Sequence, residues 1–435
     1  MTTRLPAAGT LSAIRRGASH PFLRQGGITL IDQMVASATT FFTGVVIGRA
    51  CLKEDFGFYM LGFSLFTFLL TLQGSLISTP YTVYYPRANR NEAPRLTGSS
   101  LVHQFVFSAV AGLALLTGAC AAWYSGGARM AWMLFALSAS VIFLLLRDFI
   151  RQICFAHLAV SRALAFDCMI AVGQLAALGA LAAIGLLNAA TAFAALGLVC
   201  AAAAAGWLWN VRSGVSIDVR RAALDFANHW PSAKWLFASG LVWSVSMNLY
   251  AWIVAGFHGA ASAGVWAAAL GIVTIVNPLM LGAQNFLGPR IMHAYAEGGA
   301  FSLRRIVSTS SAAYAGILLA FSACMLFGGD VLITFIYGTQ YSGNGPLVAL
   351  LSLNLACSGL GYTFSRGLFA LEHAAIDFKV NFVALAAMIT CGLFLAKTYG
   401  PVGAALGQLT ANGTATLARA GAFYVCARNH MAGRP

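Results

Sequence analysis

Long apolar runs set the strongest limit on what this chain can fold into. Twelve of them, each near the length of about 20 residues that crosses a bilayer as an α-helix, follow one another with short connections. Only 9% of the 435 residues are charged, and 59% are hydrophobic. A soluble domain carries roughly a quarter charged residues, so this chain cannot cover a water-exposed surface. We therefore predict an all-α polytopic membrane protein with about 12 transmembrane helices.

The runs divide into two sets of six around a hydrophilic connector. The predicted spans lie at 27–50, 58–80, 101–124, 130–146, 163–186 and 189–209, and then at 235–257, 262–287, 306–328, 347–371, 380–397 and 402–425. The apolar stretch 331–338 is too short to span and is assigned to a loop. The predicted domains are an N-terminal segment (1–26), a first six-helix bundle (27–209), a linker (210–232), a second six-helix bundle (233–426) and a C-terminal tail (427–435).

The two halves share a loose sequence pattern. Phe56-Gly57-Phe58-Tyr59 opens the second span and Ala263-Gly264-Val265-Trp266 opens the eighth, and each span then leads through a proline into a basic loop. A repeat of this kind implies a twofold axis along the membrane normal and a central cavity between the two bundles. A chance match is the alternative interpretation of so short a pattern.

The distribution of positive charge assigns the loops to the two sides of the membrane. Of the 26 Lys and Arg residues, 22 fall on the N-terminus, the even-numbered loops and the C-terminus, and only 4 on the odd-numbered loops. Because cytoplasmic loops carry the excess of Lys and Arg, both termini are predicted to be cytoplasmic. The net charge of +14 then reflects topology, and we expect no nucleic-acid partner. No removable signal peptide is recognised in residues 1–26, so the first span is expected to direct its own insertion.

The sequence carries no motif of a metal centre or an enzyme. Its nine cysteines are scattered, mostly inside apolar runs, without a CxxC pair, and no HExxH, Walker A or GxSxG motif is present. We expect no enzymatic activity, no cofactor and no metal. The cysteines are interpreted as small buried hydrophobic residues.

Ionisable and polar groups near or inside the spans are the candidate substrate-binding residues, because a charge in the bilayer is costly unless it meets water or a partner. They are Arg24, Asp32, Gln33, Arg147, Asp148, Arg151, Arg290 and Arg366.

These residues have two alternative interpretations. Arg147 and Arg151 are four residues apart and share a helix face, where guanidinium groups suit bidentate binding of phosphate. Alternatively, each arginine is a topology residue whose side chain reaches the membrane interface. Asp32 is either a cavity residue or a partner of Arg24 or of a neighbouring helix end, and Asp167 is favoured as a structural partner of the arginines of the fourth span.

Two stretches of the sequence resemble a known family, the polysaccharide-export and O-antigen flippases. This family belongs to the superfamily that also contains the MATE-type multidrug antiporters and the lipid II flippases. The resemblance lies in 32–86, with Ile47-Gly48-Arg49-Ala50, Phe56-Gly57-Phe58-Tyr59 and Ser78-Thr79-Pro80-Tyr81, and in 328–371, with Phe335-Ile336-Tyr337-Gly338, Tyr341 and Arg366-Gly367-Leu368.

The resemblance implies two six-helix bundles facing a cavity that opens alternately to each side of a bacterial plasma (inner) membrane. It implies a lipid-linked glycan on polyprenyl pyrophosphate as substrate, and the bilayer and the machinery of polysaccharide synthesis and polymerisation as partners. The sequence departs from the drug-antiporter pattern, because the acids of its second half, Glu297, Asp330, Glu372 and Asp377, lie in or near predicted loops. A cation-coupled MATE-type multidrug antiporter and an accessory membrane component of a polysaccharide synthase remain as alternatives.

Overall fold

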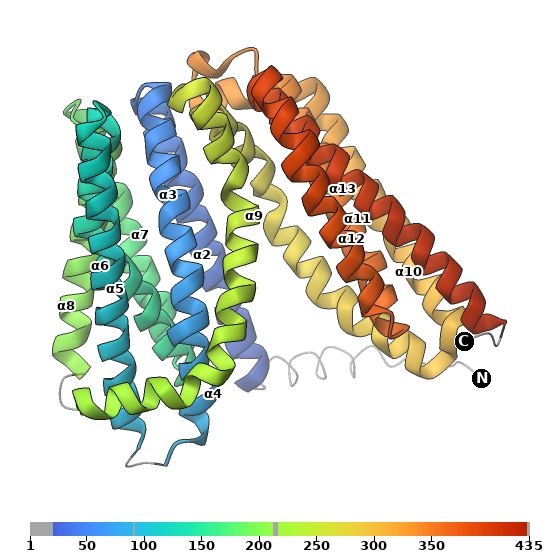
Figure 1. Ribbon diagram of the computed structural model, residues 1–435, viewed down its shortest axis with the longest axis horizontal. Coiled ribbons are helices and arrows are strands. Elements are labelled where there is room, and N and C mark those ends of the chain that lie inside the picture. The colour runs from blue at the N-terminus through green and yellow to red at the C-terminus, as the bar shows by residue number, and fades with distance from the viewer. Residues whose placement is uncertain (1–20, 90–91, 212–215, 433–435) are drawn as a thin grey trace, which may run out of the picture. The chain divides into compact units, whose positions relative to one another are not determined.

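The computed structural model describes residues 21–89, 92–211 and 216–432, and every regular element in these ranges is a helix (Figure 1). The prediction of an all-α polytopic membrane protein is confirmed. The α-helices are α2 (Pro21–Ala50), α3 (Lys53–Gln73), α4 (Thr79–Tyr84), α5 (Ala93–Tyr124), α6 (Ala128–Ala156), α7 (Val160–Ala183), α8 (Ala189–Val211), α9 (Val219–Val273), α10 (Asn277–Tyr337), α11 (Gly345–Ala370), α12 (Ala374–Ala387) and α13 (Leu393–Met431). Short π-helical or 3-10 segments, η1 (Gly74–Ser78), η2 (Tyr85–Arg87), η4 (Thr274–Val276), η5 (Thr339–Tyr341) and η6 (Met388–Gly392), lie between them.

Nine helical stretches of the described residues are long and apolar enough to cross a membrane. Two of them contain breaks at glycine: Gly259 and Gly299 interrupt the stretch Asn248–Tyr337, and Gly400 interrupts Ala375–Met431. At Gly259 the backbone has φ 80° and ψ 169°, a conformation that side chains with a Cβ rarely adopt. When the stretches are divided at these three breaks, and the segment before Gly259 is counted from the start of α9 at Val219, the described residues give twelve long helical segments, the predicted number of spans.

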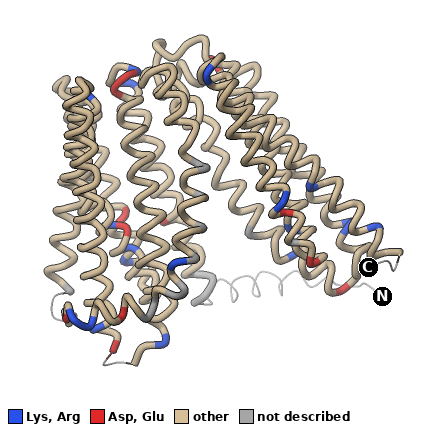
Figure 2. The backbone as a smooth tube through the Cα atoms, in the orientation of Figure 1, with Lys and Arg blue, Asp and Glu red and all other residues tan. Residues whose placement is uncertain are grey.

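The contacts divide the chain into two compact units. The first consists of the described residues up to Val46 together with Leu65–Ser244, and the second consists of Ile47–Ser64 and the described residues from Val245 onward. The division falls inside α2, α3 and α9 and therefore differs from the loop-based domain bounds drawn from the sequence. Figure 2 marks the charged residues of both units, which leave long stretches of the helices without charge.

Helix α6 forms the centre of the first unit, where it packs against α5 and α8. Leu137, Val141, Leu145 and Phe149 of this helix are all fully buried. Close approach of α8 is possible because Gly197 stands where a Cβ would lie 2.3 Å from the Ser140 hydroxyl. Such close contacts between small residues hold helices together in lipid, where no hydrophobic force drives their association.

The second unit has its core between α10, α11 and α13. Ile291, Leu303, Val307, Leu368 and Phe423 form one buried cluster there, and none of them exposes its side chain. The same unit includes the connection between α2 and α3 and the first half of α3.

This α2–α3 connection is held tightly within the second unit. Gln340 of η5 donates hydrogen bonds to the carbonyl oxygens of Gly48 and Cys51, at 2.9 and 3.1 Å. A Cβ at Gly57 would lie 1.8 Å from the carbonyl oxygen of Ala260, so only glycine allows this contact between α3 and α9.

Three predicted boundaries are corrected. Helix α5 begins at Ala93 instead of 101, and α9 begins at Val219 inside the predicted linker, because the Asp218 side chain accepts a hydrogen bond from the Arg221 amide and caps the helix. Helix α10 continues to Tyr337, so 331–337 is not part of a loop. Ile333 and Tyr337 are buried, and their packing extends the helix beyond the predicted span.

Candidate functional site

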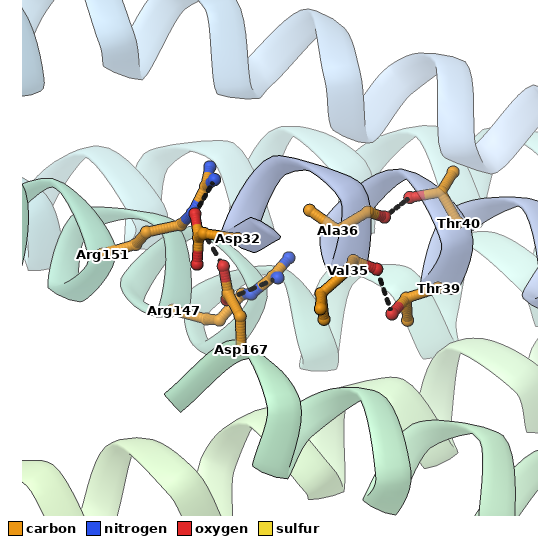
Figure 3. A network of polar contacts seen from close by, with 8 residues as sticks. All are labelled: Asp32, Val35, Ala36, Thr39, Thr40, Arg147, Arg151 and Asp167. Carbon is orange, nitrogen blue, oxygen red and sulfur yellow. Dashed lines mark hydrogen bonds and ion pairs between the residues drawn. The ribbon is translucent and has the colours of Figure 1, made fainter. Parts of the chain in front are cut away.

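A network of four charged side chains lies inside the first unit (Figure 3). It consists of Asp32 from α2, Arg147 and Arg151 from α6, and Asp167 from α7, and is called the ion network below. Arg147 Nη2 lies 2.9 Å from Asp167 Oδ1, Arg151 Nε lies 2.7 Å from Asp167 Oδ2, and Arg151 Nη2 lies 2.5 Å from Asp32 Oδ2. Asp167 therefore joins both arginines, and Arg151 joins both aspartates.

The helical period of α6 explains how the two arginines of this network come together. Arg147 and Arg151 are one turn apart on α6 and project from one face, while Leu144, Leu145 and Phe149 of the same helix are buried in the core of the unit. A charge at this depth is stable only with a partner, and α2 and α7 each supply one carboxylate. The pairing of Asp167 with the arginines of the fourth span agrees with the sequence interpretation, and Asp32 pairs with Arg151 near the end of that span, one of the alternatives left open.

The exposed part of the ion network consists of its arginine side chains. The side chains of both aspartates are 0% exposed, whereas those of Arg147 and Arg151 are 27% and 17% exposed. The arginines therefore cover the carboxylates. Arg151 also lies over the ring of Phe155, with its guanidinium carbon 5.0 Å from the ring centroid.

The other candidates of the first unit lie outside the network. Gln33 follows Asp32 in α2 but is exposed. Asp148 is half-buried beside Arg147 and makes no ion pair within 4.0 Å among the described residues. Arg24 falls in α2, and its side chain lies outside the described residues. The hydroxyl groups of Thr39 and Thr40 bond to carbonyl oxygens one turn earlier in α2.

The two candidates of the second unit have aromatic partners. The guanidinium carbon of the half-buried Arg366 lies 4.9 Å from the ring centroid of Tyr362, and that of the exposed Arg290 lies 5.3 Å from the ring centroid of Phe286. Within the part of the chain that the structure describes, neither arginine forms an ion pair. No carboxylate of the described residues compensates their positive charge by an ion pair.

Sequence reasoning missed two polar groups in the second unit. Arg419 of α13 pairs with Asp377 of α12, with Nε 2.7 Å from Oδ1. Three half-buried carboxamides, Asn354 of α11 and Gln408 and Asn412 of α13, bond to one another. The available signal was the spacing along α13, where Gln408, Asn412 and Arg419 follow the helical period within an apolar run.

No protein-family model and no curated protein matches the sequence, but solved structures do. The chain superimposes on a multidrug resistance MATE family transporter of the MOP superfamily, in an inward-facing conformation, with a TM-score of 0.69 and 15% identity over 91% of this chain and 94% of the other. The chain has the MOP-superfamily fold. This fold contains 12 transmembrane helices in two bundles, which confirms the predicted architecture.

Two further proteins with the MOP fold carry different descriptions. A MOP superfamily transporter from Pyrococcus furiosus, described as having a binding pocket of reverse polarity that suggests a different function, matches with a TM-score of 0.60 and 14% identity over 94% of this chain and 96% of the other. The lipid II flippase MurJ matches with a TM-score of 0.63 and 14% identity over 92% and 90%. These proteins are described as transporters or as a flippase.

Proposed function

We propose that this chain is a flippase that moves a polyprenyl-pyrophosphate-linked glycan from the inner to the outer leaflet by alternating access. The observation that carries the proposal is the arrangement of charge in the ion network. Its carboxylates are fully buried, and the side chains of Arg147 and Arg151 are 27% and 17% exposed. A ligand approaching the network meets arginine, and guanidinium groups bind phosphate oxygens in bidentate fashion.

The second unit adds charge of the same sign. Arg290 and Arg366 contact aromatic rings and, among the described residues, form no ion pair. Asp377, one of the acids of this half, is engaged by Arg419. This charge favours an anionic substrate over a cationic drug.

The membrane potential is a suitable driving force for such a substrate. Moving one charge across the membrane is worth about 2.3 kcal/mol per 100 mV, and an interior-negative potential favours outward movement of an anionic headgroup. Outward transport of a cation opposes the same potential and needs exchange for an ion. A flippase of an anionic lipid therefore needs no deep proton-binding acid.

Proteins of the same fold make the proposal reasonable. One is described as a lipid II flippase, and another as having a pocket whose reversed polarity suggests a different function. Within this fold, the sign of the binding charge is thus a useful guide to the substrate.

The test is deletion of the gene in its native host. Lipid-linked oligosaccharides are quantified by mass spectrometry, and surface polysaccharide and drug susceptibility are measured on the same cultures. Accumulated lipid-linked precursor with loss of surface polysaccharide is the expected result. Unchanged precursor together with new drug sensitivity would reject the flippase in favour of an antiporter.

A charge variant tests the proposed role of arginine. Arg366→Gln keeps a polar side chain but removes a charge that no described carboxylate neutralises, and we expect it to reduce export while the protein remains inserted. The matched control is Arg49→Gln, which removes an exposed charge in the last turn of α2. Equal export by Arg366→Gln and the wild type would remove this residue from the mechanism.

A cation-coupled multidrug antiporter is the second candidate, and one observation favours it. Asp32 Oδ1 is buried and has no hydrogen-bond partner among the described residues, so this oxygen can bind a proton. A drug-resistance phenotype that Asp32→Asn abolishes would support this candidate, and a phenotype confined to lipid-linked saccharides would exclude it.

The orientation and localisation belong to the same proposal. We propose a bacterial inner-membrane protein with both termini cytoplasmic, on the strength of the 22 Lys and Arg residues on one set of loops against 4 on the other. Cysteine-labelling reagents that cannot cross the membrane test the assignment. A single cysteine introduced beside Thr339 should react from outside intact cells, and one introduced in the C-terminal tail should not.

A further inference from the structure

Three carboxamide side chains join α11 and α13 inside the second unit. Asn354 Nδ2 donates a hydrogen bond to Gln408 Oε1 at 3.3 Å, and Asn412 Nδ2 donates one to Asn354 Oδ1 at 2.8 Å. These three residues are called the amide cluster. All of them are half-buried, and none of their side-chain nitrogen or oxygen atoms is among the described buried atoms that lack a hydrogen-bond partner.

The amide cluster lies deep in the membrane. Asn354 follows the first residue of α11, Gly345, by nine positions, which is about 14 Å along the helix and close to the middle of a hydrocarbon core ~30 Å thick. Open amide groups at this depth are unfavourable against lipid tails, which offer no hydrogen bonds. We therefore expect the open side of the cluster to face water or a ligand instead of lipid.

The cluster has hydrogen-bonding capacity left over. Each carboxamide carries two N–H donors and a carbonyl oxygen, and the two bonds within the cluster use only part of them. The groups are uncharged and offer both donors and acceptors. Sugar hydroxyls, which also donate and accept, are the ligand groups that match them.

A stripe on α11 leads from the amide cluster towards the far end of the helix. Asn354, Ser358, Tyr362 and Arg366 follow at intervals of four residues, each step turning by about 40° so that the row winds around α11, and Ser358 is exposed. Arg366 lies about 18 Å along the helix from Asn354 and only four residues before the last residue of α11. The stripe thus has neutral amides at membrane depth and a positive charge near the helix end.

A lipid-linked glycan has the same order of chemical groups. Its phosphates stay near the headgroup level of the leaflet, and its sugars extend away from them. We propose that the amide cluster binds the saccharide of the substrate while Arg366 binds its phosphate. This inference rests on the proposed flippase function and adds the site that distinguishes a glycosylated carrier from a bare one.

The simpler alternative is that the carboxamides only hold α11 and α13 together, as polar side chains often do in membranes. The two roles differ in what they predict for ligands. Loss of helix packing lowers thermal stability and weakens binding of any ligand, whereas loss of a saccharide site weakens binding of the glycosylated carrier alone.

The experiment measures the binding of two probes to the full-length protein in lipid nanodiscs. The probes are undecaprenyl pyrophosphate and the same lipid carrying the oligosaccharide isolated from the native host. The variants are Gln408→Met and Asn412→Leu, which keep side-chain size and remove amide groups, and Arg366→Gln. The control is Asn429→Leu, a half-buried position on the same helix outside the cluster.

We expect Gln408→Met and Asn412→Leu each to weaken binding of the glycosylated carrier about tenfold, the effect of one or two lost hydrogen bonds, and to leave the bare carrier within about twofold. Arg366→Gln should weaken both. The thermal midpoint of every variant is recorded. If Asn412→Leu does not fold, the binding of the two probes to Gln408→Met alone decides the test.

Four results would count against the inference. Equal weakening for both probes, or no weakening, overturns the saccharide site and leaves the flippase proposal intact. A wild-type protein that binds both carriers with the same affinity does the same. A wild-type protein that binds neither carrier overturns the proposed function and the saccharide site together.

Discussion

Asp167 is the side chain on which the ion network depends most, because it contacts both arginines. Asp167→Ala removes two ion pairs and leaves Arg147 without an ion pair among the described residues. Breaking a buried pair costs about 3–5 kcal/mol, and since the arginines are 27% and 17% exposed, water screens part of the freed charge. We therefore expect the lower end, about 3 kcal/mol. Asp32→Ala removes one contact and leaves Arg151 bound to Asp167, at a cost of about 1.5 kcal/mol.

The assay is unfolding in mixed micelles at increasing fractions of denaturing detergent, followed by tryptophan fluorescence. The free energy of unfolding is compared between the wild type and the single variants Asp167→Ala, Asp32→Ala and Arg147→Ala. The double variant Asp167→Ala with Arg147→Ala completes a cycle and should be destabilised by less than the sum of the Asp167→Ala and Arg147→Ala changes, because no unpaired charge remains at position 147. A larger loss for Asp32→Ala than for Asp167→Ala, or a strictly additive double variant, would refute this account of the network.

Three further predictions concern residues outside the network. Burial lowers the pKa of His157, which follows α6, so the unfolded chain binds more protons than the folded one at mildly acidic pH. Stability should rise with pH up to about 6.5, and this dependence should be absent from His157→Gln when thermal midpoints are measured across pH 5 to 8. Gly57→Ala puts a Cβ 1.8 Å from the Ala260 oxygen and should cost about 1–3 kcal/mol, whereas Gly316→Ala, with open space around it, should be neutral in the same thermal assay. Gln340→Leu frees two backbone carbonyl oxygens and should lower the unfolding free energy by about 1–3 kcal/mol; an unchanged value would mean that water replaces the amide.

The fold was predictable because each membrane-spanning helix requires a long apolar run, which is visible in the sequence. The similarity of the structure to a solved protein of the MOP fold supports that architecture. The errors fall where packing or capping changes a boundary. Helix α9 begins at Val219 because Asp218 caps it, and α10 continues to Tyr337 because that ring is buried. Neither cause changes mean hydropathy, so a search for apolar runs does not detect it.

The candidate site was predictable only in part. The spacing of Arg147 and Arg151 places them on one face of a helix, and the cost of burying a charge requires a partner such as Asp167. The amide cluster needed the structure, because Asn354 and Gln408 are 54 residues apart and meet only when α11 and α13 are rotated to face each other. Apolar helices of uniform composition do not reveal that rotation.

The geometry of Arg147 separates a binding role from a structural one. This side chain gives only Nη2 to Asp167 and its Nε is buried, so the N–H groups of Nη1 and the second N–H of Nη2 remain for a phosphate without loss of the ion pair. Arg147→Lys keeps a charge beside Asp167 but lacks the planar fork that binds phosphate in bidentate fashion. We therefore expect the free energy of unfolding of Arg147→Lys to equal that of the wild type to within about 1 kcal/mol. The variant should nevertheless lose most glycan export. Normal export by a stable Arg147→Lys protein would mean that only the charge at this position matters, and normal export by Arg147→Ala would mean that the ion network serves the fold alone.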